Sequence, residues 1–384
     1  MHYIGRPNSN SMPFPYQKIV CFVFSLLFLL NSKIYSFTRI DTIPHSTHEI
    51  IKKEKLVRAD GILNTKGWAR SFLFDFNKRD IRGKLKEWDN YNIIHPDFSL
   101  AVTCAKIPLA QIMLLKYRDH ITTKIYSTTK IILLPFRKAK MPCSPDSGDI
   151  ILYKRKNSLQ FVRKSEERDV VIDFPKFIID ADTGISAELI LNQENDKENI
   201  SIALPWKENS YFFTVSQKII AMPVEGKVQI GKKEISLSAK DTYAVLDWGR
   251  TVRPKKNNWQ WGFGCLRNDT VTISWNIGTR NDTTDIGYSQ NIIFYNGIGH
   301  KIDTINIAFD KTNLLTSWKI TSSNHRFEMI FTPFMKEASK RNYLFFKNDL
   351  KQVMGYYNGY VILDNGNRIE IKNALGLLED VHNE

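Results

Sequence analysis

The sequence predicts an all-β, antiparallel protein. Past residue 40, short runs of alternating or β-branched residues recur between turn residues, for example at 121–127, 149–154, 170–174, 211–216 and 271–277. Such runs are typical of strands. No segment past residue 40 keeps the apolar spacing of an amphipathic helix for three turns. The chain is therefore expected to form antiparallel sandwiches or barrels rather than βαβ units.

Two Asn-Gly pairs predict tight hairpins in the C-terminal third of the chain. Asn296-Gly297 lies between the strand-like runs 292–294 and 302–309, and Asn365-Gly366 lies between the runs 360–363 and 368–371. Asn and Gly readily adopt the positive φ angles that a short hairpin turn requires. The runs on either side of each pair are therefore expected to be antiparallel neighbours.

The composition is that of a globular protein with a large core. The 384 residues are 42% hydrophobic and 24% charged, with 19 Gly and 14 Pro, which excludes a disordered, collagenous or polytopic membrane protein. This length has room for two or three domains. The net charge is +14, but the basic residues are scattered among acidic ones. No nucleic-acid partner is therefore predicted.

An apolar run of twelve residues, 19–30, follows Lys18. The run is too short for a membrane-spanning helix, which needs about 20 residues, and has the length of a signal-peptide core. Residues 1–36 are therefore predicted to form a short apolar helix, either a signal peptide or an uncleaved membrane anchor. The protein is expected to be exported to the periplasm or outside the cell, or to associate with a membrane through residues 19–30.

Polar segments suggest how the remaining chain is divided. Residues 37–56 are polar and charged and are predicted to be a linker, and the polar run 279–285 indicates a break near residue 280. We therefore predict a first β-domain over residues 57–280 and a second over residues 281–384.

The sequence carries no familiar metal or cofactor motif. Only Cys104, Cys143 and Cys265 follow the apolar run. This odd number argues against a disulfide framework and leaves a single bridge open. No Cys or His cluster has metal-ligand spacing, and no catalytic-serine, zinc-protease or phosphate-binding motif is complete. No metal and no cofactor are predicted.

Four of the eight tryptophans, counting Trp275, lie within 28 residues. In a strand, Trp259 and Trp261 project to the same face, where they could wall an apolar cavity with Asp247 and Arg250 at its edge. Alternatively, the tryptophans are core residues and the Asp-Arg pair is structural. Burial would raise the pKa of Asp247 and make it a candidate acid, whereas a nearby arginine would make it a structural strap.

Five further residues lie inside strand-like runs in which alternation would otherwise give the strand one apolar face. They are Glu87, Trp88, Asp89, Arg326 and Glu328. A charge in a barrel wall must be paired or solvated, so structural ion pairing at the barrel ends is the expected role. The alternative places these residues in a ligand-binding mouth.

Several strings resemble the family labelled domain of unknown function 2804 and recur in its order across nearly all of residues 57–384: GWAR at 67–70, KEWDNY at 86–91, ALPW at 203–206, LDWGR at 246–250, WQWG at 259–262 and TSSNHRFEM at 321–329. That family has no assigned activity. More distantly, Asp247 to Arg250 followed by Trp259-x-Trp261-Gly262 is similar to a pattern of the carotenoid hydratase and AttH-like proteins. This resemblance implies two lipocalin-like barrels packed together.

The more distant resemblance implies a role for Asp247 as a proton donor, and places Trp248, Trp259 and Trp261 in a cavity or core. The chain departs from the pattern because no His stands between Asp247 and Trp248, and the spacing is two residues shorter. The acid–base chemistry of the hydratases is therefore not carried over with the pattern.

We therefore predict a protein that binds an apolar or amphipathic small molecule in a Trp-lined cavity. The expected ligand-binding residues are Trp88, Trp248, Arg250, Trp259, Trp261 and Arg326. One alternative is a hydratase, isomerase or cyclase in which Asp247 protonates an isoprenoid or polyene and the tryptophan rings stabilise the cation. Another is a carbohydrate or surface-polymer binder of the β-sandwich type, which would expose its tryptophans to solvent.

Overall fold

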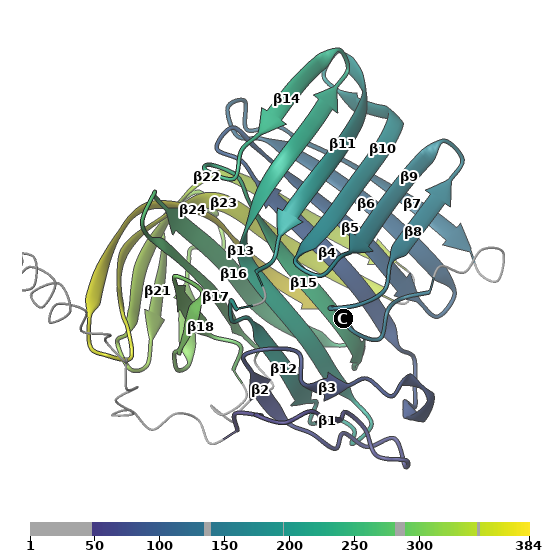
Figure 1. Ribbon diagram of the computed structural model, residues 1–384, viewed down its shortest axis with the longest axis vertical. Coiled ribbons are helices and arrows are strands. Elements are labelled where there is room, and N and C mark those ends of the chain that lie inside the picture. Colours follow the sequence, from purple (N-terminus) through teal and green to yellow (C-terminus); the bar gives the residue numbers. More distant parts are fainter. Residues whose placement is uncertain (1–47, 134–139, 195, 281–288, 344–345) are drawn as a thin grey trace, which may run out of the picture. The chain divides into compact units, whose positions relative to one another are not determined.

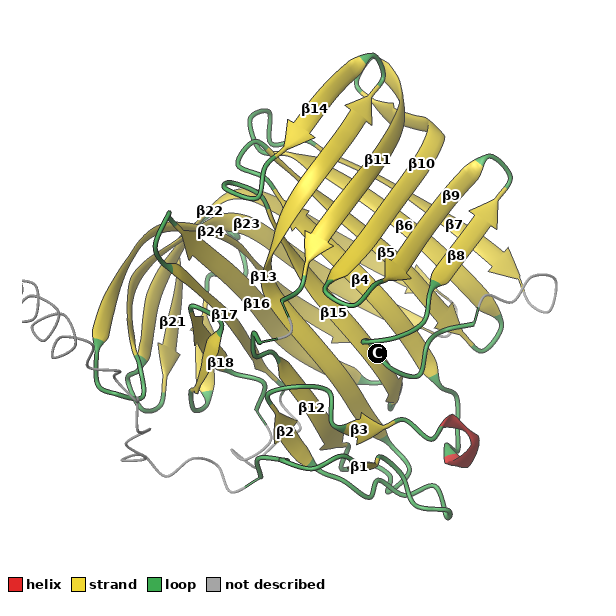
Figure 2. Cartoon of the chain, in the orientation of Figure 1, coloured by secondary structure: helices red, strands yellow, loops and turns green. Residues whose placement is uncertain are grey.

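The computed structural model describes residues 48–133, 140–194, 196–280, 289–343 and 346–384. Strands make up almost all of the regular structure in these residues, and a single 3-10 turn, η1 (Lys78–Asp80), is the only described helical element. Figure 2 shows this predominance of strands. The predicted all-β class is confirmed, and the predicted N-terminal helix lies outside the described residues.

The strands of the first half are β1 (Glu54–Lys55), β2 (Gly67–Ala69), β3 (Phe74–Asp75), β4 (Lys86–Ile94), β5 (Phe98–Ile107), β6 (Ala110–Asp119), β7 (Ile125–Leu133), β8 (Ile150–Lys154), β9 (Asn157–Arg163), β10 (Glu167–Ile179), β11 (Asp182–Asn192) and β12 (Ile200–Pro205). Those of the second half are β13 (Phe213–Ile230), β14 (Lys233–Leu237), β15 (Tyr243–Val252), β16 (Asn257–Arg267), β17 (Thr272–Thr279), β18 (Ile292–Tyr295), β19 (Ile298–Lys301), β20 (Ile305–Ala308), β21 (Trp318–Ser322), β22 (Phe327–Tyr343), β23 (Phe346–Ile362) and β24 (Arg368–Asn383).

The larger sheet has thirteen described strands, with the order β7-β6-β5-β4-β15-β13-β11-β10-β9-β8 and with β2, β12 and β14 attached at its side. It curves until β7 contacts β10, so it nearly closes into a barrel around one apolar core (Figure 1). Strand β11 shows why: Ile185, Ala187, Leu189 and Leu191 are buried and alternate with exposed or half-buried residues. One apolar face per strand drives the sheet to wrap around itself.

The long strand β13 lies in the middle of this sheet and joins its two halves. Its first half pairs with β12 and β15, and its second half pairs with β11 and β14. The register shifts between Ile219 and Met222, where Ala221 has a φ of 66°. Such a bulge bends the strand and increases its twist. The guanidinium of Arg267 donates to the carbonyl oxygen of Ala221 at 2.6 Å, which ties the bulge to β16.

The smaller sheet has nine described strands in the order β19-β18-β17-β16-β24-β23-β22-β21-β20. It curves into a half-barrel with its own core, and β17 contacts β20 across the open side. The predicted Asn365-Gly366 hairpin is present between β23 and β24. Asn296-Gly297 also forms a hairpin, but it joins β18 to β19; the run 302–309, predicted to be the partner, contains β20, and β20 pairs with β21.

A row of glycines lets the smaller sheet bend sharply. Gly264, Gly376 and Gly355 are aligned on the neighbouring strands β16, β24 and β23. A Cβ atom at Gly376 would lie 2.2 Å from the carbonyl oxygen of Phe263 and 2.7 Å from Cε2 of Tyr357. The fully buried Tyr357 ring therefore fills the space that side chains would otherwise take.

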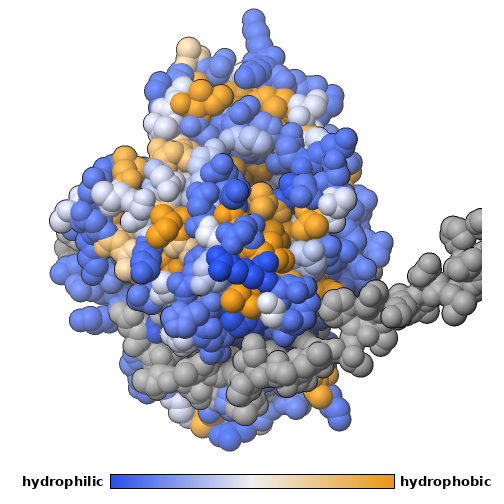
Figure 3. Space-filling model, turned by 90° about the vertical axis from the view of Figure 1, so that its left-hand side faces the viewer, coloured by the Kyte–Doolittle hydropathy of each residue, from blue (hydrophilic) through white to orange (hydrophobic). Residues whose placement is uncertain are grey.

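The two sheets pack face to face through a third apolar cluster. It contains residues of β4, β13 and β15 on one side and of β16, β22, β23 and β24 on the other. The Tyr243 hydroxyl donates to the carbonyl oxygen of Leu375 at 2.8 Å across this interface. The prediction of two curved antiparallel sheets packed together is confirmed. Figure 3 shows one face of the molecule, on which apolar and hydrophilic residues are interspersed.

Three further predictions concern the domain boundary, the N-terminal segment and the cysteines. The chain changes sheet between Val252 and Asn257, so β16 and β17 pair in the smaller sheet although the predicted domain boundary at 280 grouped them with the first domain. The predicted signal peptide or anchor, 1–36, lies outside the described residues. Among the described residues, no helix has the length and apolarity needed to cross a bilayer. Cys104, Cys143 and Cys265 are free thiols.

The glycine row predicts a large effect of Gly376→Ala. The added methyl group would collide with the Phe263 carbonyl and the Tyr357 ring, so we expect a loss of about 3 kcal/mol or more in the free energy of unfolding. Gly366→Ala is the control, because nothing lies within 4 Å of its Cβ position. It should cost only the backbone strain of its positive φ, about 1 kcal/mol. Urea unfolding measures both, and equal losses would contradict the packing role of the row.

Candidate functional site

Strand β15 presents alternate residues to two different environments. Leu246, Trp248 and Val252 belong to the core of the larger sheet, whereas Tyr243 and Val245 face the smaller sheet. By the same alternation Asp247 points towards the smaller sheet and Arg250 into the larger sheet. The expectation that Asp247 and Arg250 share one cavity edge is therefore corrected, because residues three apart on a strand lie on opposite faces.

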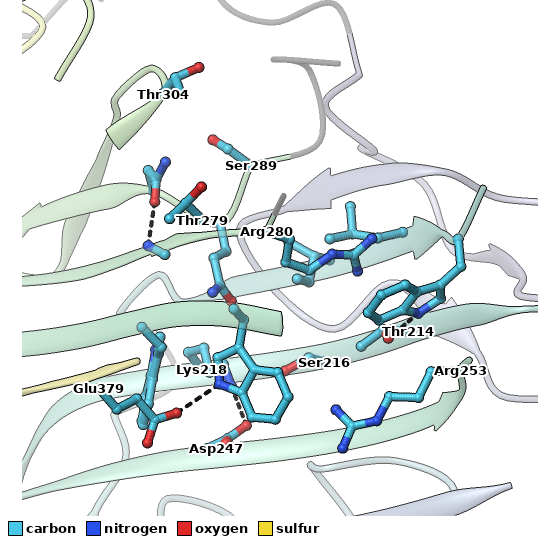
Figure 4. Close-up of a pocket in the computed structure, with 18 of the residues that line it drawn as sticks. Thr214, Ser216, Lys218, Asp247, Arg253, Thr279, Arg280, Ser289, Thr304 and Glu379 are labelled. Carbon is cyan, nitrogen blue, oxygen red and sulfur yellow. Dashed lines mark hydrogen bonds and ion pairs between the residues drawn. The ribbon is translucent and has the colours of Figure 1, made fainter. Parts of the chain in front are cut away.

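A cavity of about 470 Å³ lies on the Asp247 side, between the two sheets. Its apolar wall is formed by Trp88, Ile202, Leu204, Trp206, Trp259 and Trp261. Its polar groups come from β13, β15, β17, β24 and neighbouring loops: Thr214, Ser216, Lys218, Asp247, Arg253, Thr279, Arg280, Ser289, Gln290, Asn291, Thr304 and Glu379. Figure 4 shows most of these side chains around one space. We call this space the inter-sheet cavity.

Three of its tryptophans have their ring N–H groups satisfied by the protein. Each indole Nε1 donates to a side-chain oxygen: Trp206 to Thr214 at 3.0 Å, Trp259 to Glu379 at 2.9 Å and Trp261 to Asn276 at 2.8 Å. These bonds fix the rings in place. The ring faces rather than the N–H groups are therefore what the wall offers to a bound molecule.

The ring of the fourth tryptophan, Trp88, packs over a glycine on the neighbouring strand. Trp88 and Gly249 are direct partners in the β4–β15 register. A Cβ atom at Gly249 would lie 2.1 Å from Cζ2 of Trp88, so only glycine leaves room for the ring. The Gly in the Asp-Trp-Gly-Arg string thus positions a cavity tryptophan.

Asp247 is paired with a lysine. Lys218 stands directly opposite it on β13, and the Lys218 Nζ donates to Asp247 Oδ1. The side chains are only 9% and 16% exposed, and the ammonium group lies 4.8 Å from the centre of the Trp261 ring. The predicted partners of Asp247, Arg250 and Arg253, do not form this pair. Asp247 is a fixed negative charge at the cavity wall.

Glu379 is the carboxyl group best suited to hold a proton in the cavity. Trp259 donates to its Oε1 and Gln352 donates to its Oε2, each at 2.9 Å. Burial raises the pKa of Glu379 and the negative charge of Asp247 adds to the rise, while the two hydrogen bonds and Lys218 oppose it. The net direction is upward, which favours the protonated form more than in water.

Trp248 and Arg250 lie inside the larger sheet and away from this cavity. Arg250 is fully buried; its Nη2 is 2.9 Å from Asp89 Oδ1 and its Nε is 3.6 Å from Glu87 Oε1. Its guanidinium also stacks 4.0 Å from the Trp248 ring centre. Burial raises the pKa of Asp89, and Arg250 opposes that rise. These four residues form an internal polar cluster.

Arg326 directly precedes β22 of the smaller sheet, and its guanidinium already has hydrogen-bond acceptors nearby. Its guanidinium donates to the carbonyl oxygens of Ile362 and Lys301 and to Asp364 Oδ1, at 2.9, 3.0 and 2.6 Å. Glu328 contacts His325 at 3.2 Å. The structure therefore brings Trp88, Asp247, Trp259 and Trp261 together, and it leaves Trp248, Arg250 and Arg326 out.

Sequence reasoning missed Lys218 and Glu379 as site residues. Lys218 is one of many lysines in strand-like runs, and nothing nearby marks it. Glu379 follows the apolar run 374–378, which is a usable signal for a buried carboxyl group. Its partner Trp259, however, is 120 positions away in the chain.

A second cavity, of about 510 Å³, lies near the β13 bulge. Its arginine is already occupied, because Arg267 donates to the carbonyl oxygens of Ala221 and Ala239. Its Glu198 is bound to Arg70 at 2.7 Å. The inter-sheet cavity, with its tryptophan wall and converging charges, is therefore the candidate site. Among the residues that the structure describes, no group of three or more His, Cys, Asp or Glu could hold a metal ion.

The chain belongs to the family described as a domain of unknown function, DUF2804, whose model matches residues 47–384. No curated protein matches its sequence. Solved structures that are similar to it include an AttH-like protein and a hydratase. An AttH-like protein from Nitrosomonas europaea has a TM-score of 0.47 and 12% identity, over 79% of this chain and 93% of that one. Kievitone hydratase from Nectria haematococca has a TM-score of 0.43 and 10% identity, over 77% and 88%.

The burial of the Lys218–Asp247 pair predicts strong coupling between its members. Lys218→Met or Asp247→Leu alone leaves a charge without its partner, whereas the double variant removes both charges. We expect a coupling energy of about 2 kcal/mol or more in a double-mutant cycle of urea unfolding. The Lys227–Glu234 pair, whose side chains are 63% and 51% exposed, is the matched control and should couple by less than about 1 kcal/mol. Equal coupling energies in both cycles would show that the Lys218–Asp247 pair is not a strongly coupled, buried ion pair.

The raised pKa of Glu379 predicts a titration that Trp259 reports. The folded-state pKa lies above the ordinary value of 4.5, so Glu379 favours folding while protonated and this contribution is lost as the pH rises through the raised pKa. Tryptophan fluorescence should show a transition with a midpoint above pH 4.5. The transition should disappear in Glu379→Gln and in Trp259→Phe. A transition that persists in both variants would assign it to another group.

Proposed function

We propose that this protein binds an amphipathic small molecule in the inter-sheet cavity. The observation that carries the proposal is the combination of a preformed space of about 470 Å³, a wall of four tryptophans and a few converging charged groups. Small-molecule sites are typically concave, largely apolar and lined by a few polar groups that fix orientation. The cavity has these features.

The placement of the charges supports an amphipathic rather than a purely apolar ligand. Lys218, Asp247 and Glu379 lie close together at one end of the cavity, and Arg253 and Arg280 lie at the other (Figure 4). Ring faces of Trp259 and Trp261 lie on the cavity wall with their N–H groups already bonded. A ligand with an apolar body and a polar end would cover the rings and still satisfy the charges.

The burial of the tryptophans argues against the carbohydrate-binding alternative. Trp206 and Trp261 are each 5% exposed, and no tryptophan is among the large hydrophobic side chains exposed in the described residues. Sugar-binding platforms of the β-sandwich type present their rings to solvent. The inter-sheet cavity instead surrounds what it binds.

A hydratase-like activity is the second candidate, and the environment of Glu379 favours it. In this proposal the protonated Glu379 transfers its proton to an alkene carbon, so that the O–H bond breaks as a C–H bond forms and a cation remains. The tryptophan ring faces stabilise the cation. Water then adds to it and returns a proton to Glu379, so the net change is the addition of water. Asp247 contributes a fixed negative charge.

Binding and catalysis can be separated with one variant. Glu379→Gln removes the transferable proton and keeps nearly the same volume. If the protein is a hydratase, this variant should retain affinity for an alkene substrate and lose turnover. If the protein is a binder, untargeted mass spectrometry of co-purifying molecules should find the same ligand, chemically unchanged, with the wild type and the variant.

Filling the cavity with a larger side chain should weaken binding. Thr279 lines the cavity from the end of β17, so Thr279→Trp should weaken binding of the uncharged fluorescent probe N-phenyl-1-naphthylamine by about tenfold or more. The matched control is Thr332→Trp, at an exposed position on β22 that lines neither cavity. It should bind the probe like the wild type. Absence of saturable binding, or equal affinity in both variants, would contradict the proposal.

A further inference from the structure

We propose that the ligand of the inter-sheet cavity carries an anionic head group, a carboxylate or a phosphate, which Arg253 binds with the help of Lys86 and Arg280. This inference rests on the proposed binding function and names the chemical class of the ligand.

Arg253, which is half-buried, lacks the hydrogen-bond and ion-pair partners that Arg267 and Arg326 have. Its guanidinium carbon lies 4.9 Å above the Trp259 ring centre. Within the described residues no carboxylate and no hydrogen-bond acceptor contacts its guanidinium, and its Nε is a buried donor without a partner. By contrast, Arg267 donates to two carbonyl oxygens and Arg326 to two carbonyl oxygens and a carboxylate. Buried donors of a charged group are costly to leave unsatisfied.

Two further cations lie beside Arg253. Arg280 lines the same cavity, with its guanidinium carbon 4.0 Å from the Trp206 ring centre and its Nη2 donating to the Pro205 carbonyl oxygen at 3.1 Å. Lys86 is on β4, two residues before Trp88, and therefore projects to the same face of the sheet. No ion pair or side-chain hydrogen bond of Lys86 exists within the described part of the chain.

The electrostatic effect of this gathering is consistent with an anion site. Burial, together with the smaller effect of the Arg280 charge, lowers the pKa of Arg253 to about 10. Burial likewise lowers the pKa of Lys86, and Arg253 adds to that effect. Like charges held together at a half-buried position repel one another. A bound anion would offset this repulsion and accept the unsatisfied donors.

Among the described residues, the two acids that line the cavity are bound to other groups. Asp247 is paired with Lys218, and both oxygens of Glu379 accept hydrogen bonds from Trp259 and Gln352. Trp259 separates the two ends, because its ring face lies under Arg253 while its N–H points to Glu379. A ligand with its anionic head at Arg253 would therefore lay its apolar part along the tryptophans. The guanidinium fork suits both carboxylate and phosphate oxygens.

Displacement of a neutral probe tests the inference. N-phenyl-1-naphthylamine bound to the wild-type protein is displaced with dodecanoate, dodecyl phosphate, dodecanol or dodecylamine, each below its micelle concentration. At least one anion should displace the probe at a concentration about tenfold or more below that of dodecanol, and dodecylamine should be the weakest. Which anion is stronger identifies carboxylate or phosphate as the head group, and equal strength of both also supports the site.

Variants then assign the preference to Arg253. Arg253→Gln should abolish the advantage of the anions over dodecanol when each competitor is compared at that variant's own probe affinity, and Arg253→Lys should restore most of it. Lys256→Gln removes the same charge at an exposed position three residues away, and should keep the preference. Thermal unfolding verifies that each variant is folded.

The outcomes separate this inference from the proposed function. If the probe binds in the cavity but dodecanol competes as well as both anions, the head-group inference is overturned and the binding function stands. A preference that survives Arg253→Gln, or that Lys256→Gln removes equally, also overturns it. If the probe does not bind in the cavity at all, the proposed function itself fails.

Discussion

Strand β15 is buried on both faces, and the organisation of the site follows from this constraint. Nine of its ten residues are fully buried, and Asp247 alone is half-buried. One face completes the core of the larger sheet, while the other packs against the smaller sheet. Because side chains alternate, the string Asp247-Trp248-Gly249-Arg250 is split between two environments. Trp248 and Arg250 build the internal polar cluster, whereas Asp247 and the Trp88 ring over Gly249 face the inter-sheet cavity.

The cavity combines features that depend on one another. Beside its tryptophan wall the Lys218 and Asp247 side chains are only 9% and 16% exposed, which strengthens their attraction, and burial favours the neutral form of Glu379. The same wall leaves Arg253 with a ring face and no acceptor among the described residues. The two sheets must remain packed for these groups to meet, because the cavity lining draws on β4, β12, β13 and β15 from one sheet and on β16, β17 and β24 from the other. Binding and the integrity of the sheet interface should therefore be coupled.

Local features of the fold were predictable from the sequence, and long-range features were not. The hairpins at Asn296-Gly297 and Asn365-Gly366 depend on turn chemistry within a few residues, and Trp259 and Trp261 share the cavity because they are two apart on one strand. The partner of Asp247 could not be predicted, because the pairing of β13 with β15 sets Lys218 opposite it. Glu379 reaches the cavity only because β24 pairs with β16. Register between distant strands decides such contacts, and no local pattern encodes it.

The proposed binding space lies between the sheets and not inside either barrel. A crystal structure of the protein with a brominated long-chain alcohol distinguishes these positions, because anomalous scattering from bromine locates the ligand without reference to any side chain. If the ligand occupies the inter-sheet cavity, a bromine peak will lie within contact distance of Trp88 or Trp259, between β15 and β16. A peak inside the larger sheet beside Trp248 and Arg250, or inside the smaller sheet beside Tyr357, would contradict this location.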